Sequence, residues 1–255
     1  MEKIKKLSKW IRLNGVKGIG PSRAMKLIHH FGGVDRIFSS SSKELEETRI
    51  FDEKNLAEFG RVQNSSDDAL QQALERAWRN GMRMRALYEP EYPRRLKFIP
   101  DPPATLFYYG NYALVERKII AVVGTRQAEK NSLDFSRKFC RELAEKDCVI
   151  CSGGALGIDT RAHQGLLDTG RGDTICVFGT GLARPYPEEN IGLFEKIKRK
   201  GGLIVSENLP NFPGSSIAFV RRNRITSGLS DAVVLIASGE KGGAMIQSKI
   251  AHQQK

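Results

Sequence analysis

The 255-residue sequence contains few cysteines, and their arrangement does not suggest a metal site. Cys148 and Cys151 form one Cys-x-x-C pair, but the intervening Val149 and Ile150 predict a strand. Residues three apart in a strand face opposite sides. No second cysteine pair stands at zinc-ligand spacing. We therefore expect reduced, packed thiols, no metal and no cofactor.

Long apolar runs and acidic residues are also scarce. No apolar stretch approaches the ~20 residues that a membrane span needs, and residues 1–6, MEKIKK, lack the apolar core of a signal peptide. We therefore expect a soluble, cytoplasmic protein without a membrane partner. The 29 Asp and Glu are outnumbered by 41 Lys and Arg, which gives a formal net charge of +12. This excess attracts polyanions such as nucleic acids, although a charge that serves only solubility is the alternative.

Residues 1–85 are predicted to form a small all-helical domain with short connections. Gly18 and Gly20 interrupt the chain, Pro21 suits a first helical turn, and apolar residues then recur at helical spacing. This pattern is typical of a helix-hairpin-helix, in which glycine amides meet DNA phosphate without reading bases. Lys17, Gly18 and Gly20 are therefore a candidate second DNA contact. The alternative is a tight turn that packs two helices or contacts protein.

Residues 86–255 form the second predicted domain. Its first part, to about residue 111, contains five prolines, which exclude a long helix and predict an extended, turn-rich lead-in. From Arg117 onward, continuous apolar runs alternate with helical segments, which predicts an α/β fold with a doubly wound, mostly parallel sheet. The expected strands cover residues 119–123, 148–151, 173–178, 202–206 and 232–236.

One crossing helix, residues 132–145, carries an apolar stripe. Phe135, Phe139 and Leu143 recur every four residues along it. We expect these three side chains to pack on the sheet.

Glycine-rich turns follow three of the expected strands. Because the carboxyl ends of parallel strands meet at one edge, we expect these turns to converge there. Backbone amides at such turns, helped by a helix N-terminus, can bind phosphate from either a nucleotide or a nucleic-acid backbone. The residues proposed to contact it are Gly124, Thr125, Arg126, Ser152, Gly153, Gly154, Ala155, Gly157, Gly179 and Gly181.

An arginine-rich segment later in the chain adds positive charge. Arg221, Arg222 and Arg224 are candidate DNA ligands, and we expect one or two to bind while another, with Asn223, braces the site. Phe219 either stacks on an unpaired base or packs in the core. Arg126, at the end of the first glycine turn, is similarly expected to bind phosphate through two hydrogen bonds; bracing that turn is its alternative role.

Three further residues are expected to brace the site. Asp159 and His163 stand one helical turn apart, where Asp159 would cap the glycine loop and His163 would hold it by hydrogen bonding. A catalytic acid–base pair is the alternative. A single Asp-His pair is a weak signal, so we expect no enzymatic activity. Glu207 is expected to pair with one of the arginines.

These segments resemble the DNA-processing protein A family, also called DprA or Smf. The resemblance rests on Val123-Gly124-Thr125-Arg126, on residues 152–159 with Ala162-His163, on Gly179-Thr180-Gly181-Leu182 with Tyr186-Pro187 and Asn190, on Ser206-Glu207 and on residues 219–230. It implies a Rossmann-like domain preceded by a SAM-like helical domain. It also implies a homodimer that binds single-stranded DNA, protects incoming strands during natural transformation and recombination, and helps to load the RecA recombinase.

The sequence departs from the family pattern near its end. Ile236 stands where a glutamate is expected, and the turn at residues 242–248 has lost its early hydroxyl donors. The amides of Gly242 and Gly243 can still meet a phosphate, so both remain candidate contacts. The chain stops at Lys255, before a strand that usually follows. Either the sheet is one strand short or the chain is truncated.

Two other function classes remain open. A nucleotide-processing enzyme of a related Rossmann-like fold, of the nucleoside monophosphate phosphoribohydrolase type, uses a Pro-Gly-Gly-x-Gly-Thr turn followed by a glutamate. Here Lys241-Gly242-Gly243-Ala244 stands in that place, with no matching Thr-x-x-Glu. An interaction scaffold with a vestigial phosphate site is the third possibility.

Overall fold

The computed structural model describes residues 2–238 and 243–254. The chain divides into two compact units. The first consists of Met1–Tyr92 with Pro102–Thr105, and the second of Pro93–Asp101 with Leu106–Lys255. Each unit is built around its own apolar core.

The first unit is mainly helical, as predicted. Its elements are α1 (Glu2–Gly15), α2 (Pro21–Phe31), α3 (Val34–Ser39), α4 (Ser42–Glu47), α5 (Glu53–Asn64), α6 (Asp68–Arg79) and the short strand β1 (Arg83–Ala86). Its core contains the fully buried side chains of Trp10, Leu27 and Phe59. Capping boxes at Ser41 and Asp52 begin α4 and α5. These caps satisfy backbone amides that would otherwise lack partners at the helix starts.

The glycine hairpin between α1 and α2 has the predicted local structure. Gly18 has φ +88°, a conformation that favours glycine. Gly20 is the N-cap of α2, and Pro21 occupies its first turn. Ile19 points inward and is fully buried. The hairpin therefore packs α1 and α2 through Ile19 and leaves its two glycines at the surface.

The second unit is built on a mixed sheet. Its strands are β2 (Thr105–Gly110), β3 (Ile119–Gly124), β4 (Val149–Gly153), β5 (Thr174–Val177), β6 (Leu203–Ser206) and β7 (Ala232–Ala237). They run in the order β2-β6-β5-β4-β3-β7. β2 is antiparallel to β6, whereas the pairs from β6 to β7 are parallel. Every residue of β4, β5 and β6 is buried, which explains their unbroken apolar runs.

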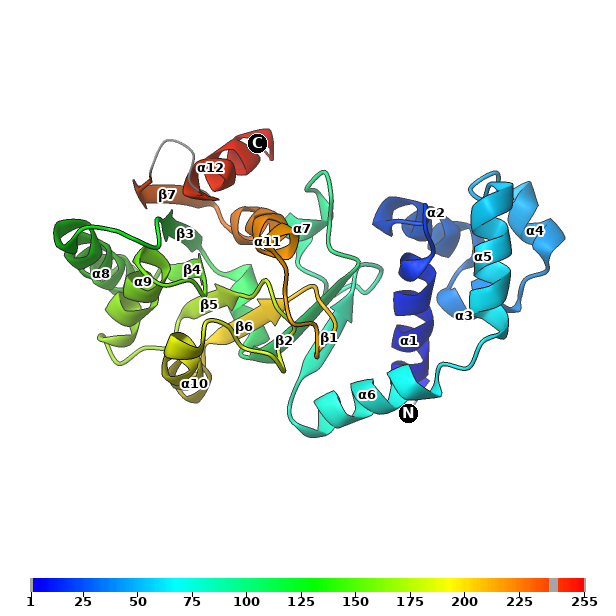
Figure 1. Cartoon of the computed structure of the whole chain (residues 1–255), viewed down its shortest axis with the longest axis horizontal. Coiled ribbons are helices and arrows are strands. Elements are labelled where there is room, and N and C mark those ends of the chain that lie inside the picture. Colours follow the sequence, from blue (N-terminus) through cyan, green and yellow to red (C-terminus); the bar gives the residue numbers. More distant parts are fainter. Residues whose placement is uncertain (1, 239–242, 255) are drawn as a thin grey trace. The chain divides into compact units, whose positions relative to one another are not determined.

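Helices cover both faces of this sheet (Figure 1). α8 (Lys130–Glu145), α9 (Ile158–Leu167) and α10 (Ile191–Arg199) lie on one face, and α11 (Ser216–Leu229) lies on the other with α12 (Gly243–Gln253) beside it. Shorter helices are α7 (Arg94–Lys97), η1 (Tyr112–Glu116) and η2 (Glu188–Asn190). This is the predicted Rossmann-like, doubly wound and mostly parallel α/β fold.

Strand order places a switch point at β3. From β3 the chain adds β4, β5 and β6 on one side, and then returns to add β7 on the other. α8, which follows β3, and α12, which follows β7, lie on opposite faces of the sheet, and a cavity lies at the carboxyl end of β3. Ligands of open α/β sheets bind at this place.

An ion-pair cluster lies at the opposite, amino-terminal edge of the sheet. Arg117 Nη1 lies 2.6 Å from Asp173 Oδ1, and Arg117 Nη2 lies 2.7 Å from Asp147 Oδ1. Arg171 pairs with the same two aspartates. These two arginines are thus neutralised locally and contribute to the integrity of the fold.

The structure corrects two expectations about local structure. Phe135 does not pack on the sheet, since 55% of it is exposed and its ring stacks on Phe139. The buried residues of α8 are instead Ser136, Cys140 and Ala144. The second correction concerns the list of expected strands, which lacked one in the lead-in; the lead-in itself is extended and turn-rich, without a long helix, as predicted. It contains α7 and β2, and β2 pairs with β6 as part of the sheet.

All four cysteines are free thiols, and all are buried. Burial raises the pKa of the Cys151 thiol to about 12. Among residues 2–238 and 243–254, no group of three or more His, Cys, Asp or Glu side chains is placed so that it could hold a metal ion. No helix in that part of the chain is long and apolar enough to span a membrane.

Candidate functional site

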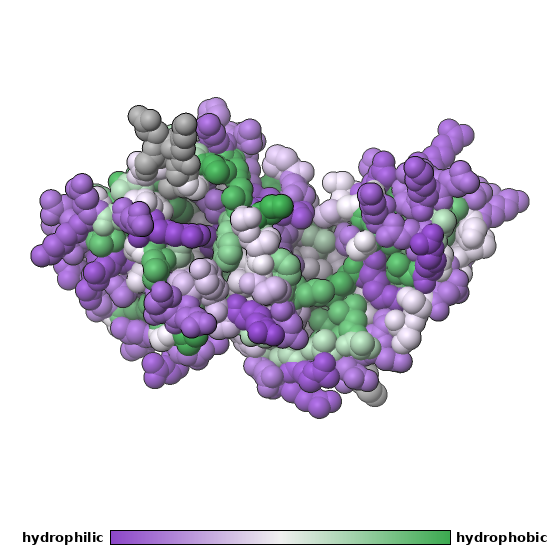
Figure 2. Space-filling model, viewed as in Figure 1, coloured by the Kyte–Doolittle hydropathy of each residue, from purple (hydrophilic) through white to green (hydrophobic). Residues whose placement is uncertain are grey.

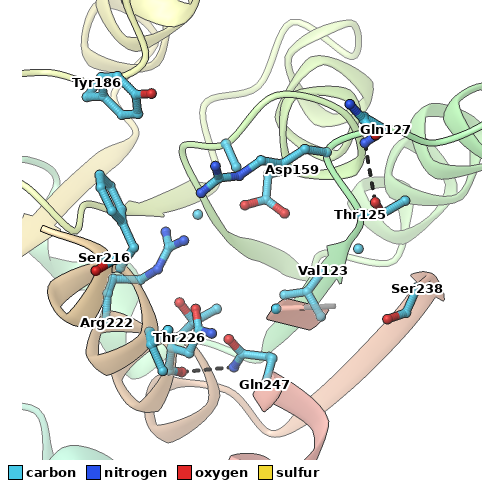
Figure 3. Close-up of a pocket in the computed structure, with 18 residues that line it drawn as sticks. Val123, Thr125, Gln127, Asp159, Tyr186, Ser216, Arg222, Thr226, Ser238 and Gln247 are labelled. Carbon is cyan, nitrogen blue, oxygen red and sulfur yellow. Dashed lines mark hydrogen bonds between the residues drawn. The ribbon is translucent and has the colours of Figure 1, made fainter. Parts of the chain in front are cut away.

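A cavity of about 660 Å³ lies at the carboxyl ends of β3 and β4, at the switch point (Figure 3). The turn after β3, the glycine turn after β4, and parts of α11 and α12 form its walls. The predicted site residues that line it are Gly124, Thr125, Arg126, Gly153, Ala155, Asp159, Phe219, Arg222, Asn223 and Gly243. A small pocket of about 60 Å³ shares several of these residues and adds Gly154 and Gly179. The predicted convergence of the three glycine turns is therefore present.

Arg222 is the buried cation of this cavity. Its Nη1 donates a hydrogen bond to the carbonyl of Val177, the last residue of β5. The guanidinium also lies against Gly153, where any β-carbon would collide with it. Arg222 is thereby fixed to the end of one strand while its side chain forms part of the cavity wall.

Arg126 is the exposed cation of the cavity. Within the described residues it makes no ion pair with an acidic side chain at 4.0 Å or less, so no such pair braces the turn. The turn is held by its own backbone and by Thr125, whose Oγ1 accepts a hydrogen bond from the Gln127 amide at 3.3 Å. The guanidinium of Arg126 is thus available to an anion at the mouth of the cavity.

Glycine is required in these turns by neighbouring protein atoms. A β-carbon at Gly124 would lie 2.5 Å from the Ile158 side chain, and one at Gly179 would lie 2.5 Å from the Phe219 ring. Gly157 has φ +82°, and a β-carbon there would lie 2.5 Å from the Thr125 carbonyl oxygen. The glycines therefore allow turns, helices and rings to pack closely around the cavity.

The glycine turn after β4 is held by its carbonyl groups. Three successive carbonyls, at residues 153–155, accept hydrogen bonds from His163 Nε2 at 2.8 Å, Asn190 Nδ2 at 2.9 Å and Thr160 Oγ1 at 2.8 Å. The Ala155 amide donates to the carboxylate of Asp159. This amide is already paired, so the phosphate cradle predicted for the turn is partly occupied by the protein's own carboxylate.

Asp159 and His163 make their hydrogen bonds to other groups and not to each other. Burial lowers the pKa of His163 to about 4, so its imidazole is neutral at pH 7. Nε2–H donates to the Gly153 carbonyl, and Nδ1 faces the Thr174 hydroxyl at 2.7 Å. Burial raises the pKa of Asp159, whereas Arg222 and Arg126 act in the opposite direction. Both residues brace the glycine turn, as expected.

Arg221 and Arg224 lie outside the residues that line the cavity. Arg224 is buried, with Nη2 2.6 Å from Glu207 Oε2 and Nε 3.0 Å from Asp101 Oδ2. Arg221 is exposed, and its Nη2 lies 3.4 Å from the same Asp101 oxygen. Successive residues of a helix point about 100° apart, so the arginines on α11 diverge. Arg224 thus takes the bracing role, with Glu207 as its predicted partner.

Other predicted contacts lie behind the cavity wall. Ser152 is buried, and its Oγ donates to the Val122 carbonyl at 2.6 Å. Gly181 packs against the backbone at Leu209 and Pro210, away from the cavity. Asn223 reaches the cavity, and its carbonyl accepts a hydrogen bond from Gln247 Nε2 at 2.8 Å. Gly242 lies outside the described residues.

Several residues of the cavity were not predicted. Tyr186 is half exposed, and its ring centroid lies 5.6 Å from that of Phe219. It follows a glycine turn and precedes Pro187, which was the available sequence signal. Gln127, Thr226 and Gln247 also line the cavity. These polar residues carry no motif that would distinguish them from ordinary helix and loop residues.

The hairpin of the first unit has a different environment. The Lys17 amide donates to Glu58 Oε2 at 3.2 Å, and the Gly18 carbonyl accepts from Arg23 Nη1 at 3.0 Å. Lys17, Gly18 and Gly20 are exposed. A carboxylate therefore already occupies part of the anion-binding position that a phosphate would take.

The fold and the cavity define a class of protein. A doubly wound α/β domain with glycine turns and two arginines at its switch point is of the kind that binds nucleotides or nucleic acids. Known sequences identify the family. The sequence model of the DNA recombination-mediator protein A family matches residues 83–255, and this chain belongs to that family.

Relatives share both sequence and fold. Protein Smf from Synechocystis sp. is 34% identical over 248 residues, which is 96% of this chain and 61% of that protein. DNA processing protein DprA from Bacillus subtilis is 36% identical over 165 residues, which is 64% of this chain and 55% of that protein. The chain thus spans less than two thirds of the length of these two relatives.

Solved structures agree with this assignment. DprA from Streptococcus pneumoniae superposes with a TM-score of 0.82 at 28% identity, covering 97% of this chain and 83% of that chain. DprA from Helicobacter pylori gives a TM-score of 0.61 at 31% identity, covering 68% of this chain and 77% of that chain. The latter structure is described as giving insight into that protein's single-stranded DNA binding mode.

Proposed function

We propose that this protein binds single-stranded DNA in the cavity at the switch point. The observation that carries the proposal is the presence of two arginines, Arg126 and Arg222, on one cavity that also includes the half-exposed ring of Tyr186. Guanidinium groups bind phosphate through paired hydrogen bonds, and exposed aromatic rings stack on unpaired bases of any sequence. A duplex keeps its bases stacked inside, so this chemistry favours single strands. The net charge of +12 adds long-range attraction.

The cellular role that we propose is protection of incoming single-stranded DNA and help in loading RecA during natural transformation and recombination. Membership of a family described as recombination mediators supports the recombination part. The single-stranded DNA binding mode described for the H. pylori relative supports the ligand. Protection and RecA loading rest on the resemblance of the motifs.

We also propose a homodimer as the working form. Exposed apolar side chains on α11 and α12 support it, namely Ile217, Val220 and Ile246. Figure 2 shows apolar atoms gathered where these two helices lie. Large contiguous apolar patches on a protein surface mark protein–protein interaction sites, ligand grooves or membrane contacts.

We further propose that the protein is not an enzyme. The neutral, buried His163 donates to a backbone carbonyl and lies outside the residues that line the cavity, which supports a structural role. The alternative, a nucleotide-processing enzyme, predicts release of free base from nucleoside monophosphates. Incubating the protein with each monophosphate and measuring free base by chromatography decides between them, since a binding protein releases none.

Filter binding across a salt series tests the main proposal. Labelled 30-nucleotide oligo-dT and a 30-base-pair duplex are compared between 50 and 400 mM KCl, a range over which phosphate contacts weaken steeply. We expect the single strand to bind at least about tenfold more tightly than the duplex. Equal affinity for both would reject the proposal, and so would a lack of binding at the lowest salt.

A further inference from the structure

The inner wall of the cavity carries three hydrogen-bonding side chains that phosphate binding does not explain. They are Asp159 at the start of α9, Thr226 on α11 and Gln247 on α12, and we call them the inner polar group. All three are at least 95% buried. Figure 3 shows them around one space, with Asp159 on the side opposite Thr226 and Gln247.

Part of this group lacks a hydrogen-bonding partner. Thr226 Oγ1 is buried and has none among the described residues. Arg222 Nε, beside the same cavity, is also buried and has no hydrogen-bonding partner among the described residues. Gln247 uses its Nε2 on the Asn223 carbonyl, which leaves its Oε1 as an acceptor. Buried polar atoms in native proteins are nearly always paired with protein or water, so Thr226 Oγ1 and Arg222 Nε are open to a hydrogen bond with a polar group that enters the cavity.

The inner end of the cavity differs from its mouth in the groups that it offers to a ligand. Arg126 at the mouth is exposed and attracts phosphate. The inner end holds the buried Asp159, whose carboxylate accepts N–H donors and has the buried Arg222 as a neighbouring positive charge. A nucleotide inserted base-first satisfies both ends, and a cavity of about 660 Å³ is large enough for one.

The edges of the four bases differ in how they fit a carboxylate. Guanine presents two adjacent donors, N1–H and N2–H, which match the two oxygens of one carboxylate. Adenine and cytosine each place one amino donor beside an acceptor nitrogen, and thymine places one N–H between two carbonyls. In these three, a carboxylate meets one donor and at least one repelling lone pair. Guanine donors also favour the ionised form of Asp159.

We propose that the inner polar group reads the edge of one unpaired base and selects guanine, with Asp159 accepting from N1–H and N2–H. Thr226 and Gln247 complete the contact with the remaining polar atoms of the base. The proposal rests on single-stranded DNA binding in this cavity and adds base preference to it. Asp159 is thus a specificity-determining residue as well as a brace of the glycine turn.

Five-nucleotide probes test the proposal on the full chain. Each carries one base flanked by abasic tetrahydrofuran residues, so the phosphates are constant and guanine quadruplexes cannot form. Fluorescence anisotropy gives the affinity for guanine, adenine, cytosine, thymine, hypoxanthine and a fully abasic probe. We expect guanine to bind about tenfold more tightly than adenine. Hypoxanthine, which lacks the N2 amino group, should lose most of that advantage.

Variants identify the side chain responsible. D159N replaces one acceptor by a donor and should abolish the guanine preference, whereas D168N makes the same change at the surface end of α9 and should keep it. T226V should weaken the base-bearing probes more than the abasic one. Circular dichroism confirms that each variant is folded, and the hypoxanthine comparison needs no variant at all.

The outcomes separate this proposal from the proposed function. If every probe binds alike, including the abasic one, base reading is wrong while DNA binding stands. If adenine or thymine is preferred, the assignment of Asp159 as a guanine acceptor is wrong. If neither these probes nor 30-nucleotide oligo-dT bind, the proposed function itself fails.

Discussion

Two glycine turns of this protein carry the same local signal and have different surroundings. In the hairpin of the first unit, the Lys17 amide donates to Glu58. In the turn after β4, the Ala155 amide donates to Asp159. In each turn, one backbone amide thus donates a hydrogen bond to a carboxylate of the protein itself. The second turn also adjoins a cavity with Arg126 and Arg222, whereas the residues of the first turn lie outside that cavity.

The comparison shows what makes a glycine turn bind an anion. Glycine permits close approach of the backbone, but at residues 153–157 the space is filled largely by the protein itself. What distinguishes the second turn is the cavity and the guanidinium groups around it. Four changes to the chain, ordered by expected effect, test whether this distinction holds.

The largest effect is expected from Gly157→Ala. Gly157 has φ +82° and ψ −126°, and a β-carbon would lie 2.5 Å from the Thr125 carbonyl oxygen. We expect a loss of about 3 kcal/mol or more in the free energy of unfolding of the second unit. Gly20→Ala in the hairpin is the matched control, since nothing lies within 4 Å of its β-carbon. We expect it to change stability by less than about 1 kcal/mol.

Urea unfolding followed by two signals measures this difference. Both tryptophans, Trp10 and Trp78, lie in the first unit, so their fluorescence reports on that unit. Circular dichroism reports on both units. Gly157→Ala should shift the dichroism transition more than the fluorescence transition. Equal effects of Gly157→Ala and Gly20→Ala would show that the two turns are equally constrained.

The next effect concerns pH, because an imidazole holds the second turn. Burial lowers the pKa of His163 to about 4, below its usual value of 6.5. Between these values the unfolded chain binds a proton that the native protein does not, so stability falls as the pH falls. Between pH 7 and pH 5 the loss is about 2 kcal/mol. His163→Gln has no imidazole to protonate. Its free energy of unfolding should therefore fall by about 2 kcal/mol less than that of the unaltered protein between pH 7 and pH 5.

Urea unfolding at pH 5, 6 and 7 measures both proteins. The difference between their slopes against pH isolates His163 from the carboxylates, which both proteins share. Parallel slopes would mean that the imidazole takes up a proton as readily in the native protein as in the unfolded chain, and that burial does not lower its pKa.

A smaller effect, on binding, is expected from Arg126→Ala. This change removes the exposed guanidinium of the cavity and should weaken oligo-dT binding about tenfold without unfolding the protein. Lys17→Ala removes a cation from the hairpin and should weaken binding less than about twofold. Filter binding at one salt concentration compares the two. Similar losses would mean that the two glycine turns contribute alike.

The smallest effect is expected from Glu58→Ala, which frees the Lys17 amide. Since the hairpin lies outside the cavity that holds Arg126 and Arg222, we expect oligo-dT affinity to rise less than about threefold. Glu53→Ala makes the same change in net charge on the same helix and is the control. A tenfold rise in the Glu58 variant alone would show that the hairpin is an anion site masked by its own carboxylate.

Much of the fold could be predicted, because buried parallel strands have an unmistakable pattern. The apolar runs that became β3 to β7 lie within a few residues of the expected positions. β2 was missed, because the prolines before it signal a lead-in and its partner β6 lies almost 100 residues away. Pairing at that distance leaves no local trace in the sequence.

One position of α8 was wrong for a different reason: Phe139 and Leu143 pack against the core as expected, whereas Phe135 is exposed. Phe135, Phe139 and Leu143 recur every four residues, as do Ser136, Cys140 and Ala144. α8 packs closely on α9, where a β-carbon at Gly165 would collide with the backbone of Arg137. Close approach favours the stripe of small residues over the larger apolar one.

The candidate site was predictable in its location and less so in its members. Strand ends and glycine turns placed the cavity, and Arg126 and Arg222 line it as expected. Arg221 and Arg224 share the same sequence run but point elsewhere, because one residue along a helix turns the side chain by about 100°. Thr226 and Gln247 come from α11 and α12, and only their packing in three dimensions brings them to the cavity.

The hydrogen bond from Arg222 to the Val177 carbonyl has a consequence for the affinity of ligand binding. A surface arginine must give up many rotamers when it captures a ligand, which weakens the complex. The Arg222 side chain has already lost this rotamer freedom on folding, so its guanidinium is held in one orientation before a ligand binds. If the cavity binds DNA as we propose, short oligonucleotides, which make few contacts, gain the most affinity from this preorganisation.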